Sequence, residues 1–262
     1  MKAMIFAAGL GKRLGNITES IPKALVDING KTVLQMAVEK CSKHGFNDII
    51  INVHHFADMV EDEAKRLKKT GFRISVSDER DKLLENGGGL YKAREFFDKD
   101  PFLLYNVDIV SDFDLSSLYK LHLEKKGLAT LAVRHRPGQR FLLVDNEGQL
   151  RGWRNISTGE QILAGVTNTG LSEIAFSSMH IVEPEIFNYM NEGIYSMIDL
   201  YLRLAEHHNI FTLKHDEGYW IDVGTPESLG YVRKLLLKLP ESSGKDSEHS
   251  NNLKSSDNHQ EA

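Results

Sequence analysis

Two glycines and several cations follow the first apolar segment of the chain. Gly9 and Gly11 precede a Lys-Arg pair in the stretch AAGLGKRL, and Lys23 follows a proline farther along. Glycine lets a backbone approach a ligand closely or adopt a positive φ, and cations beside such a loop favour a phosphate-bearing ligand. A strand-to-helix turn with solvated cations is the alternative, and the loop alone does not decide between the two.

The loop differs from the two common phosphate-binding motifs. The third glycine position of a dinucleotide fingerprint holds Leu14, and no acidic residue ends the second predicted strand. The loop is not a P-loop either, because no Gly-Lys-Ser/Thr sequence follows the glycines. A phosphate ligand would therefore have to be held in another way.

Strand-like and helix-like segments alternate through the first half of the chain. In the first helical segment, Val33, Leu34 and Ala37 recur at helical spacing. Such βαβ units predict an α/β fold with a doubly wound, mostly parallel, Rossmann-like sheet. Strands are expected at 2–8, 48–55, 72–79 and 102–109, and a small β-hairpin excursion with an Asn-Glu-Gly turn is expected at 141–153.

Doubly wound sheets bind ligands beyond the carboxyl ends of their strands. The positions just after the predicted strands hold several glycines and carboxylates, together with a pair of histidines and a tryptophan. This coincidence predicts a site assembled from residues 9–23, 54–55, 85–89, 106–112 and 220–225.

Four motifs in order resemble the sugar-1-phosphate nucleotidyltransferases, also called NDP-sugar pyrophosphorylases. The first is Gly-x-Gly-x-Arg-Leu with Thr18 and Pro22-Lys23-x-Leu25. The others are LLENGGGLYKA (83–93), FLLYNVDIVSDFDL (102–115) and YWIDVGTPESL (219–229). The resemblance extends from the N-terminus to about Leu236 and is strongest to the N-acetylmuramate-1-phosphate uridylyltransferases, with mannose- and heptose-1-phosphate guanylyltransferases close behind.

Two departures from the family pattern stand near the predicted site. This chain has Asn16-Ile17-Thr18 where the family usually has Pro-Leu-Thr, and Val107-Asp108 where it usually has Gly-Asp. The first alters loop rigidity and the second adds a β-branched side chain beside a metal position. Neither removes a charged group that the chemistry requires.

The resemblance implies a GT-A-like fold and a reaction of an NTP with a sugar 1-phosphate, giving an NDP-sugar and pyrophosphate. It implies Mg²⁺ as the cofactor, with Asp108 and Asp222 as its ligands, and Arg13 and Lys23 as the catalytic cations. UTP and N-acetylmuramic acid 1-phosphate are the leading substrates by this resemblance. The implied nucleotide-binding residues are Ala8, Gly9, Gly11, Lys12, Asn86, Gly87, Gly88 and Asn106.

Other polar residues receive secondary interpretations. Ser177 and Ser178 lie in a segment that resembles the acceptor-site strand of the family, and the basic residues Arg134, Arg136 and Arg140 are expected to hold the sugar phosphate. The remaining interpretations are a structural or substrate-contacting role for His54 and His55 without zinc, a core position for Trp220, and helix capping for Asp112 and Asp114.

Composition excludes some classes of function. Net charge is −5 with scattered basic residues, which does not indicate a nucleic-acid partner, and the single cysteine, Cys41, excludes an internal disulfide. The first apolar run is too short for a membrane span, so a cytoplasmic protein, monomeric or a small homo-oligomer, is expected. Residues 1–239 are expected to form the nucleotidyltransferase domain, and the apolar-poor segment 240–262 a disordered polar tail.

Three alternative functions stay open. Within the enzymes, these are a mannose- or heptose-1-phosphate guanylyltransferase and a cytidylyltransferase of an alcohol phosphate, which the Arg-Leu-Gly of the entry loop resembles. From another class, the chain could be a catalytically silent regulatory subunit that binds a nucleotide sugar. The presence of Arg13, Lys23, Asp108 and Asp222 together favours an enzyme, because a pure binding protein does not need that whole set.

Overall fold

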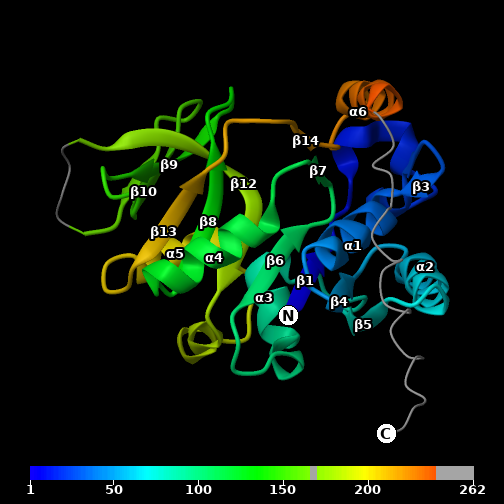
Figure 1. Cartoon of the computed structure of the whole chain (residues 1–262), viewed down its shortest axis with the longest axis horizontal. Coiled ribbons are helices and arrows are strands. Elements are labelled where there is room, and N and C mark those ends of the chain that lie inside the picture. The colour runs from blue at the N-terminus through cyan, green and yellow to red at the C-terminus, as the bar shows by residue number, and fades with distance from the viewer. Residues whose placement is uncertain (166–169, 240–262) are drawn as a thin grey trace, which may run out of the picture.

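A computed structural model describes residues 1–165 and 170–239 (Figure 1). Within them ten strands form one central sheet, and two further pairs of short strands lie beside it. The predicted tail at 240–262 lies outside the described residues. None of the described helices is long and apolar enough to cross a membrane.

One half of the sheet is parallel, as the alternating sequence pattern predicts. Met4 faces one side of the sheet while Ala3 and Ile5 face the other, so β1 packs against two separate apolar clusters. The continuous apolar runs follow from this burial on both faces. In spatial order the parallel strands are β5 (Arg73–Asp78), β4 (Asp48–Val53), β1 (Lys2–Phe6) and β6 (Phe102–Asn106).

The other half of the sheet is largely antiparallel. The long strand β12 (Ser172–Val182) joins the halves, because it pairs with β6 near its end and with β9 near its start. The predicted hairpin is confirmed as β9 (Arg140–Val144) and β10 (Leu150–Asn155). The remaining strands are β8 (Ala129–Arg134), β11 (Gln161–Leu163) and β13 (Ile210–Lys214), of which β13 runs parallel to β8.

Helices cover both faces of the sheet, which confirms the α/β class with a mostly parallel central region. One apolar cluster contains buried residues of α1 (Val33–Lys43), α2 (Ala57–Lys69), α4 (Leu115–Lys125) and α6 (Pro226–Lys238). The opposite cluster contains residues of α3 (Glu85–Lys92) and α5 (Met197–Leu204). The β9–β10 hairpin and α2 lie at opposite ends of the molecule (Figure 1).

The late strand that carries Asp222 lies outside the central sheet. It is β14 (Trp220–Asp222), which pairs antiparallel with β7 (Ile109–Ser111). The sequence pattern groups residues 220–225 with the positions after the strands of one sheet, but Asp222 belongs to a separate two-stranded sheet. The short β7 directly follows the Asp108 turn, and this pairing brings Asp222 to the sheet edge from outside. The other short pair is β2 (Asp27–Ile28) with β3 (Lys31–Thr32).

The triple glycine forms the first turns of α3, not a loop. The resemblance implies that Gly87 and Gly88 bind the nucleotide, but their lack of a side chain also has a packing explanation. A Cβ at Gly87 would lie 2.5 Å from the Tyr195 ring, and one at Gly88 would overlap the carbonyl oxygen of Gly193. The glycines are therefore required by close packing of the 193–195 segment, and the nucleotide contacts of Gly87 and Gly88 stay a prediction.

Substitution of two helical glycines by alanine should change stability in opposite directions. Gly88→Ala places a methyl group against backbone, and such overpacking costs about 1–3 kcal/mol. A Cβ at Gly230 in α6 meets nothing within 4 Å, so Gly230→Ala should gain up to about 1 kcal/mol of helix propensity. We expect thermal melts to show a lower Tm for the first and a Tm raised by about 2–4 °C for the second. Equal shifts would contradict the packing explanation.

Candidate active site

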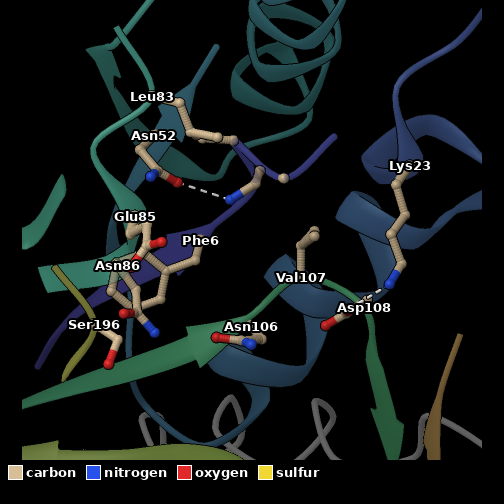
Figure 2. A pocket seen from close by; sticks show the side chains of 13 residues that line it. Phe6, Lys23, Asn52, Leu83, Glu85, Asn86, Asn106, Val107, Asp108 and Ser196 are labelled. Carbon is tan, nitrogen blue, oxygen red and sulfur yellow. Dashed lines mark hydrogen bonds and ion pairs between the residues drawn. The ribbon is translucent and has the colours of Figure 1, made fainter. Parts of the chain in front are cut away.

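A cavity of about 370 Å³ opens at the carboxyl ends of the parallel strands (Figure 2). The chain just after β1, the end of β4 and the turn after β6 form its walls, together with the start of α3. This is the edge where the sequence predicted a site. Of the predicted residues, Ala8, Gly9, Lys23, Asn86, Asn106 and Asp108 line the cavity.

A lysine lies between the two predicted metal-binding carboxylates. The Lys23 ammonium donates to Asp108 Oδ2 and lies 3.4 Å from Asp222 Oδ1, and Figure 2 shows the first contact. Arg13 Nη2 donates to the other oxygen of Asp222 at 3.1 Å. The side chains of Lys23, Asp108 and Asp222 are 10%, 18% and 33% exposed. Four residues from three distant parts of the chain thus meet as one charged cluster.

The N-terminal loop holds Lys23 in place. Gly11 has φ 65°, and a Cβ there would lie 3.1 Å from Lys23 Cβ and from the Thr18 methyl group. The Thr18 hydroxyl donates to the carbonyl oxygens of Gly11 and Gly15 at 3.0 and 3.2 Å, which closes the loop on itself. Gly11 is therefore needed for the left-handed turn that packs against Lys23. The neighbouring Lys12 is exposed.

Main-chain hydrogen bonds set the positions of the two aspartates. The Val107 N–H donates to the Phe6 carbonyl at 3.1 Å, which fixes the turn after β6 to the end of β1. The Val223 N–H donates to the Asp108 carbonyl at 2.9 Å, which joins the end of β14 to the same turn. The two carboxylates therefore meet through backbone geometry.

Burial raises the pKa of the Asp108 carboxyl above its ordinary value, and the neighbouring Asp222 charge adds to this while Lys23 opposes it. The ionised form of Asp108 is thus costly without compensating positive charge. Positive charge beside Asp108 is therefore favoured at this cluster.

A buried polar network beneath the cavity was missed by the sequence analysis. The Ala7 N–H donates to Asn52 Oδ1 at 2.7 Å, and Asn52 Nδ2 donates to Glu79 Oε1 at 2.8 Å (Figure 2 shows the first bond). Glu79 is 1% exposed, and its backbone carbonyl contacts His54 Nδ1 at 2.7 Å. An asparagine inside the apolar run DIIINV was the available signal, since a buried amide must find partners.

The α3 asparagine has a structural contact as well as a place in the cavity wall. Asn86 Oδ1 accepts from the Met197 N–H at 2.8 Å, where α5 begins. The cavity and the packing of α3 on α5 therefore depend on the same side chain.

The two serines of the predicted acceptor strand, Ser177 and Ser178, have different environments. Ser177 is fully buried, and its hydroxyl contacts His215 Nε2 at 2.8 Å, so its predicted contact with the sugar is wrong for this arrangement. Ser178 is part-exposed with φ 59°. The register of β12 against β8 shifts between Phe176 and His180, so the serines form an irregularity in the strand.

Trp220 packs against the edge of the apolar core, as expected, but it stays part-exposed. Its Nε1 donates to the Ser177 carbonyl at 3.0 Å, and the Arg136 guanidinium lies 4.6 Å from the ring centroid. Arg134 Nη2 donates to the Asp216 carbonyl at 3.1 Å, whereas Arg140 is exposed at the start of β9. Two of the three predicted arginines thus contact the chain at residues 216–220, and their contact with the sugar phosphate stays a prediction.

The two further aspartates after β6 have different roles. Asp114 caps α4, as predicted, by accepting from the Ser116 N–H at 2.9 Å. Asp112 instead accepts from the Tyr219 N–H at 2.9 Å and so holds the start of β14, and its predicted capping role is wrong. The described residues contain no group of three or more His, Cys, Asp or Glu side chains placed to hold a metal ion.

The sequence of this chain matches the family model described as nucleotidyl transferase over residues 2–238. The chain belongs to the nucleotidyl transferase family. It is 31% identical over 256 residues to a UTP–glucose-1-phosphate uridylyltransferase of Synechocystis, covering 91% of this chain and 64% of that protein, slightly less than two thirds of its length. It is 30% identical to an N-acetylmuramate alpha-1-phosphate uridylyltransferase of Caulobacter vibrioides, covering 86% of this chain and 93% of that protein.

Solved structures support the fold assignment. HddC from Yersinia pseudotuberculosis aligns with a TM-score of 0.71 at 21% identity, covering 90% of this chain and 99% of the other. The nucleotidyl transferase family member described here therefore has the mixed α/β fold of its structural neighbours.

Removal of the Glu79 charge should change the pH dependence of stability. Burial raises the pKa of Glu79 above its ordinary 4.5, so the unfolded chain loses this proton first as pH rises, and ionisable Glu79 lowers stability toward neutral pH. We expect the Tm of Glu79→Gln minus that of the wild type to increase between about pH 4 and pH 8.

Exposed Glu124 on α4 provides the matched control. The Tm difference for Glu124→Gln should stay flat over the same range. A flat or falling difference for Glu79→Gln would contradict the buried-charge explanation.

Proposed function

We propose that this protein transfers a nucleotidyl group from an NTP to a sugar 1-phosphate and releases pyrophosphate. The observation that carries the proposal is the placement of Lys23 between Asp108 and Asp222 at the wall of the cavity. Membership of the nucleotidyl transferase family supports it, as do the names of the two relatives.

The chemistry explains why the cluster contains cations and carboxylates. The second pKa of a phosphate monoester is about 6, so the acceptor phosphate is already an adequate nucleophile at pH 7. Attack on the α-phosphorus in line with the leaving pyrophosphate needs no strong general base. Repulsion between two polyanions is the obstacle, and neutralisation with positioning removes it.

Each charged residue has a role in this proposal. Arg13, whose planar guanidinium suits bidentate contacts, holds the β- and γ-phosphates. Lys23 moves its point charge from the carboxylates to the α-phosphate and the acceptor phosphate as negative charge builds. The chain at Ala8, Gly9 and Asn106 receives the nucleoside within the cavity, with Asn86 at the opposite wall.

The two aspartates fit Mg²⁺. Mg²⁺ takes oxygen ligands, with one or two carboxylates plus substrate phosphates and waters, and Asp108 and Asp222 approach one ammonium from two sides. The chemistry that Mg²⁺ supplies when bound is neutralisation of the phosphates and their alignment for attack. The proposed Mg²⁺ ligands therefore do not include His54 and His55, which follow β4.

UTP and N-acetylmuramic acid 1-phosphate are the proposed substrates. The Caulobacter relative, which this chain spans almost completely, supports this choice, and the ENGGG segment resembles the uridylyltransferase form. The proposal includes a cytoplasmic location, where NTPs are supplied, and a product that serves as a cell-wall precursor.

A substrate panel tests the proposal directly. The protein is incubated with Mg²⁺, each of the four NTPs and a set of sugar 1-phosphates, and pyrophosphate release is measured. We expect the fastest release with UTP and N-acetylmuramic acid 1-phosphate. Faster release with GTP or CTP would overturn the substrate choice, and no release with any pair would support the silent regulatory subunit.

Asp108 and Asp222 should behave as one metal-binding unit. We expect Asp108→Asn and Asp222→Asn each to lower turnover on the order of 100-fold or more, because the metal supplies several kcal/mol of charge stabilisation. The double variant should be little slower than either single one, since groups that act together are not additive. Turnover is measured as pyrophosphate release at saturating Mg²⁺.

Two further measurements test whether Asp108 and Asp222 share one metal ion. The Tm of metal-free Asp108→Asn should equal or exceed that of the wild type, because burial and the Asp222 charge both disfavour the Asp108 carboxylate, while Lys23 keeps Asp222 as a partner. The exposed loop variant Asp81→Asn should keep wild-type turnover. Multiplication of the two rate losses in the double variant would contradict a shared metal.

A further inference from the structure

Three buried side-chain nitrogens without a hydrogen-bond partner gather at one place among the described residues. They are Arg134 Nη1, Arg136 Nε and His215 Nδ1. Arg134 ends β8, Arg136 follows in the next loop, and His215 directly follows β13, which pairs with β8. Two of these atoms are guanidinium N–H donors, and buried donors without partners are costly, so this cluster indicates a missing acceptor.

Both guanidinium groups are held by neutral partners. Arg134 Nη2 donates to the carbonyl of Asp216 at 3.1 Å and to that of Gly218 at 3.4 Å. Arg136 Nη2 donates to the Phe176 carbonyl at 3.1 Å, and its guanidinium stacks on the Trp220 ring. These contacts orient the two side chains, and among the described residues neither guanidinium forms a direct ion pair with a carboxylate.

The nearby carboxylates are engaged elsewhere. The Asp216 carboxylate accepts from the His135 backbone N–H at 2.8 Å and contacts His135 Nδ1 at 2.8 Å, while Asp222 contacts Lys23 and Arg13. Burial lowers the pKa of Arg136, and the Arg134 charge adds to this while Asp222 opposes it. Two like charges are therefore held together at the edge of the Asp222 cluster.

The strand geometry places this pair beside the reaction centre. Trp220 and Asp222 are two residues apart in β14, so their side chains point to the same face. The nucleotide cavity lies on the Lys23 and Asp108 side of Asp222. Arg136, stacked on Trp220, thus extends the cluster away from the cavity. Arg134 and Arg136 are both part-exposed residues, although their unpartnered nitrogens are themselves buried.

We propose that Arg134 and Arg136 form an oxyanion-binding subsite for the acceptor. The ligand chemistry is a carboxylate or phosphate group, which matches the bidentate donor geometry of a guanidinium. The oxyanion is either the 1-phosphate of the acceptor or a carboxylate carried on its sugar. This inference rests on the proposed nucleotidyl transfer, because that reaction defines the acceptor.

The irregularity in β12 supports a built site. Ser178 has φ 59° in a non-glycine residue, and the register shift falls at the same place. The shift lies next to the Phe176 and Ser177 carbonyls, which accept from Arg136 and Trp220. Unfavourable backbone conformations of this kind are retained chiefly where they serve function.

A pair of matched acceptors identifies the oxyanion. N-acetylmuramic acid 1-phosphate and N-acetylglucosamine 1-phosphate differ by one carboxylate-bearing ether group. We expect Arg136→Gln to raise the acceptor KM on the order of 10- to 100-fold, the effect of losing a charged hydrogen bond, while UTP binding measured by calorimetry stays unchanged. If the KM of Arg136→Gln rises only for N-acetylmuramic acid 1-phosphate, the bound oxyanion is the carboxylate. If the KM rises equally for both acceptors, the bound oxyanion is the phosphate.

Two further variants keep the result interpretable. Arg136→Lys retains the charge without the bidentate donors and should show an intermediate KM. Arg154→Gln, an exposed arginine of β10 paired with Glu173, should leave KM unchanged. An unchanged acceptor KM in Arg136→Gln, or an equal rise in Arg154→Gln, would overturn the subsite.

A binding measurement separates this proposal from the proposed function. Sodium sulfate should raise the Tm of the wild type and of Arg154→Gln more than that of Arg136→Gln, at ionic strength matched with sodium chloride. This measurement needs no turnover, so it tests the subsite even if no substrate pair releases pyrophosphate. Equal sulfate shifts in all three proteins would overturn the oxyanion subsite.

Discussion

The contact of one ammonium group with two carboxylates organises this protein. Lys23, Asp108 and Asp222 come from the N-terminal loop, the turn after β6 and the end of β14, and each charge is partly removed from water. Such a cluster is stable only when its charges compensate one another. The glycine turn, the backbone bond between Val223 and Asp108 and the small β7–β14 sheet all serve to bring these groups together.

The two halves of the sheet supply different parts of the candidate site. The parallel half ends at the cavity, where strand carboxyl ends and the Asn52–Glu79 network present backbone and amide groups. The antiparallel half supplies Arg134 and Arg136 through β8 and the loop after it. β14 lies between these parts and carries Asp222 toward the first and Trp220 toward the second. A reaction that joins two polyanions requires positive charge on both sides of the reacting phosphates.

The glycine run and Ser177 show how a polar or flexible residue near a site can serve packing. Gly87 and Gly88 allow close approach of the chain at 193–195, and the Ser177 hydroxyl contacts buried His215. Both were interpreted from sequence as ligand contacts. Glycine and serine suit ligand contact as well as packing. Only the group that lies next to the residue in the folded protein shows which of the two roles it has.

The sequence alone predicted the α/β class, the hairpin and the edge of the sheet where the cavity lies, and the family resemblance named the charged residues that meet there. The spacing of apolar residues and the alternation of strands with helices can be read from short stretches of sequence. Parallel strands present their carboxyl ends at the same edge of the sheet. Tertiary structure decided the rest: that Asp222 arrives on a separate two-stranded sheet, that Asn52 and Glu79 support the cavity, and that Arg134 and Arg136 gather while Arg140 lies exposed. These facts depend on contacts between residues far apart in the chain, which no local pattern encodes.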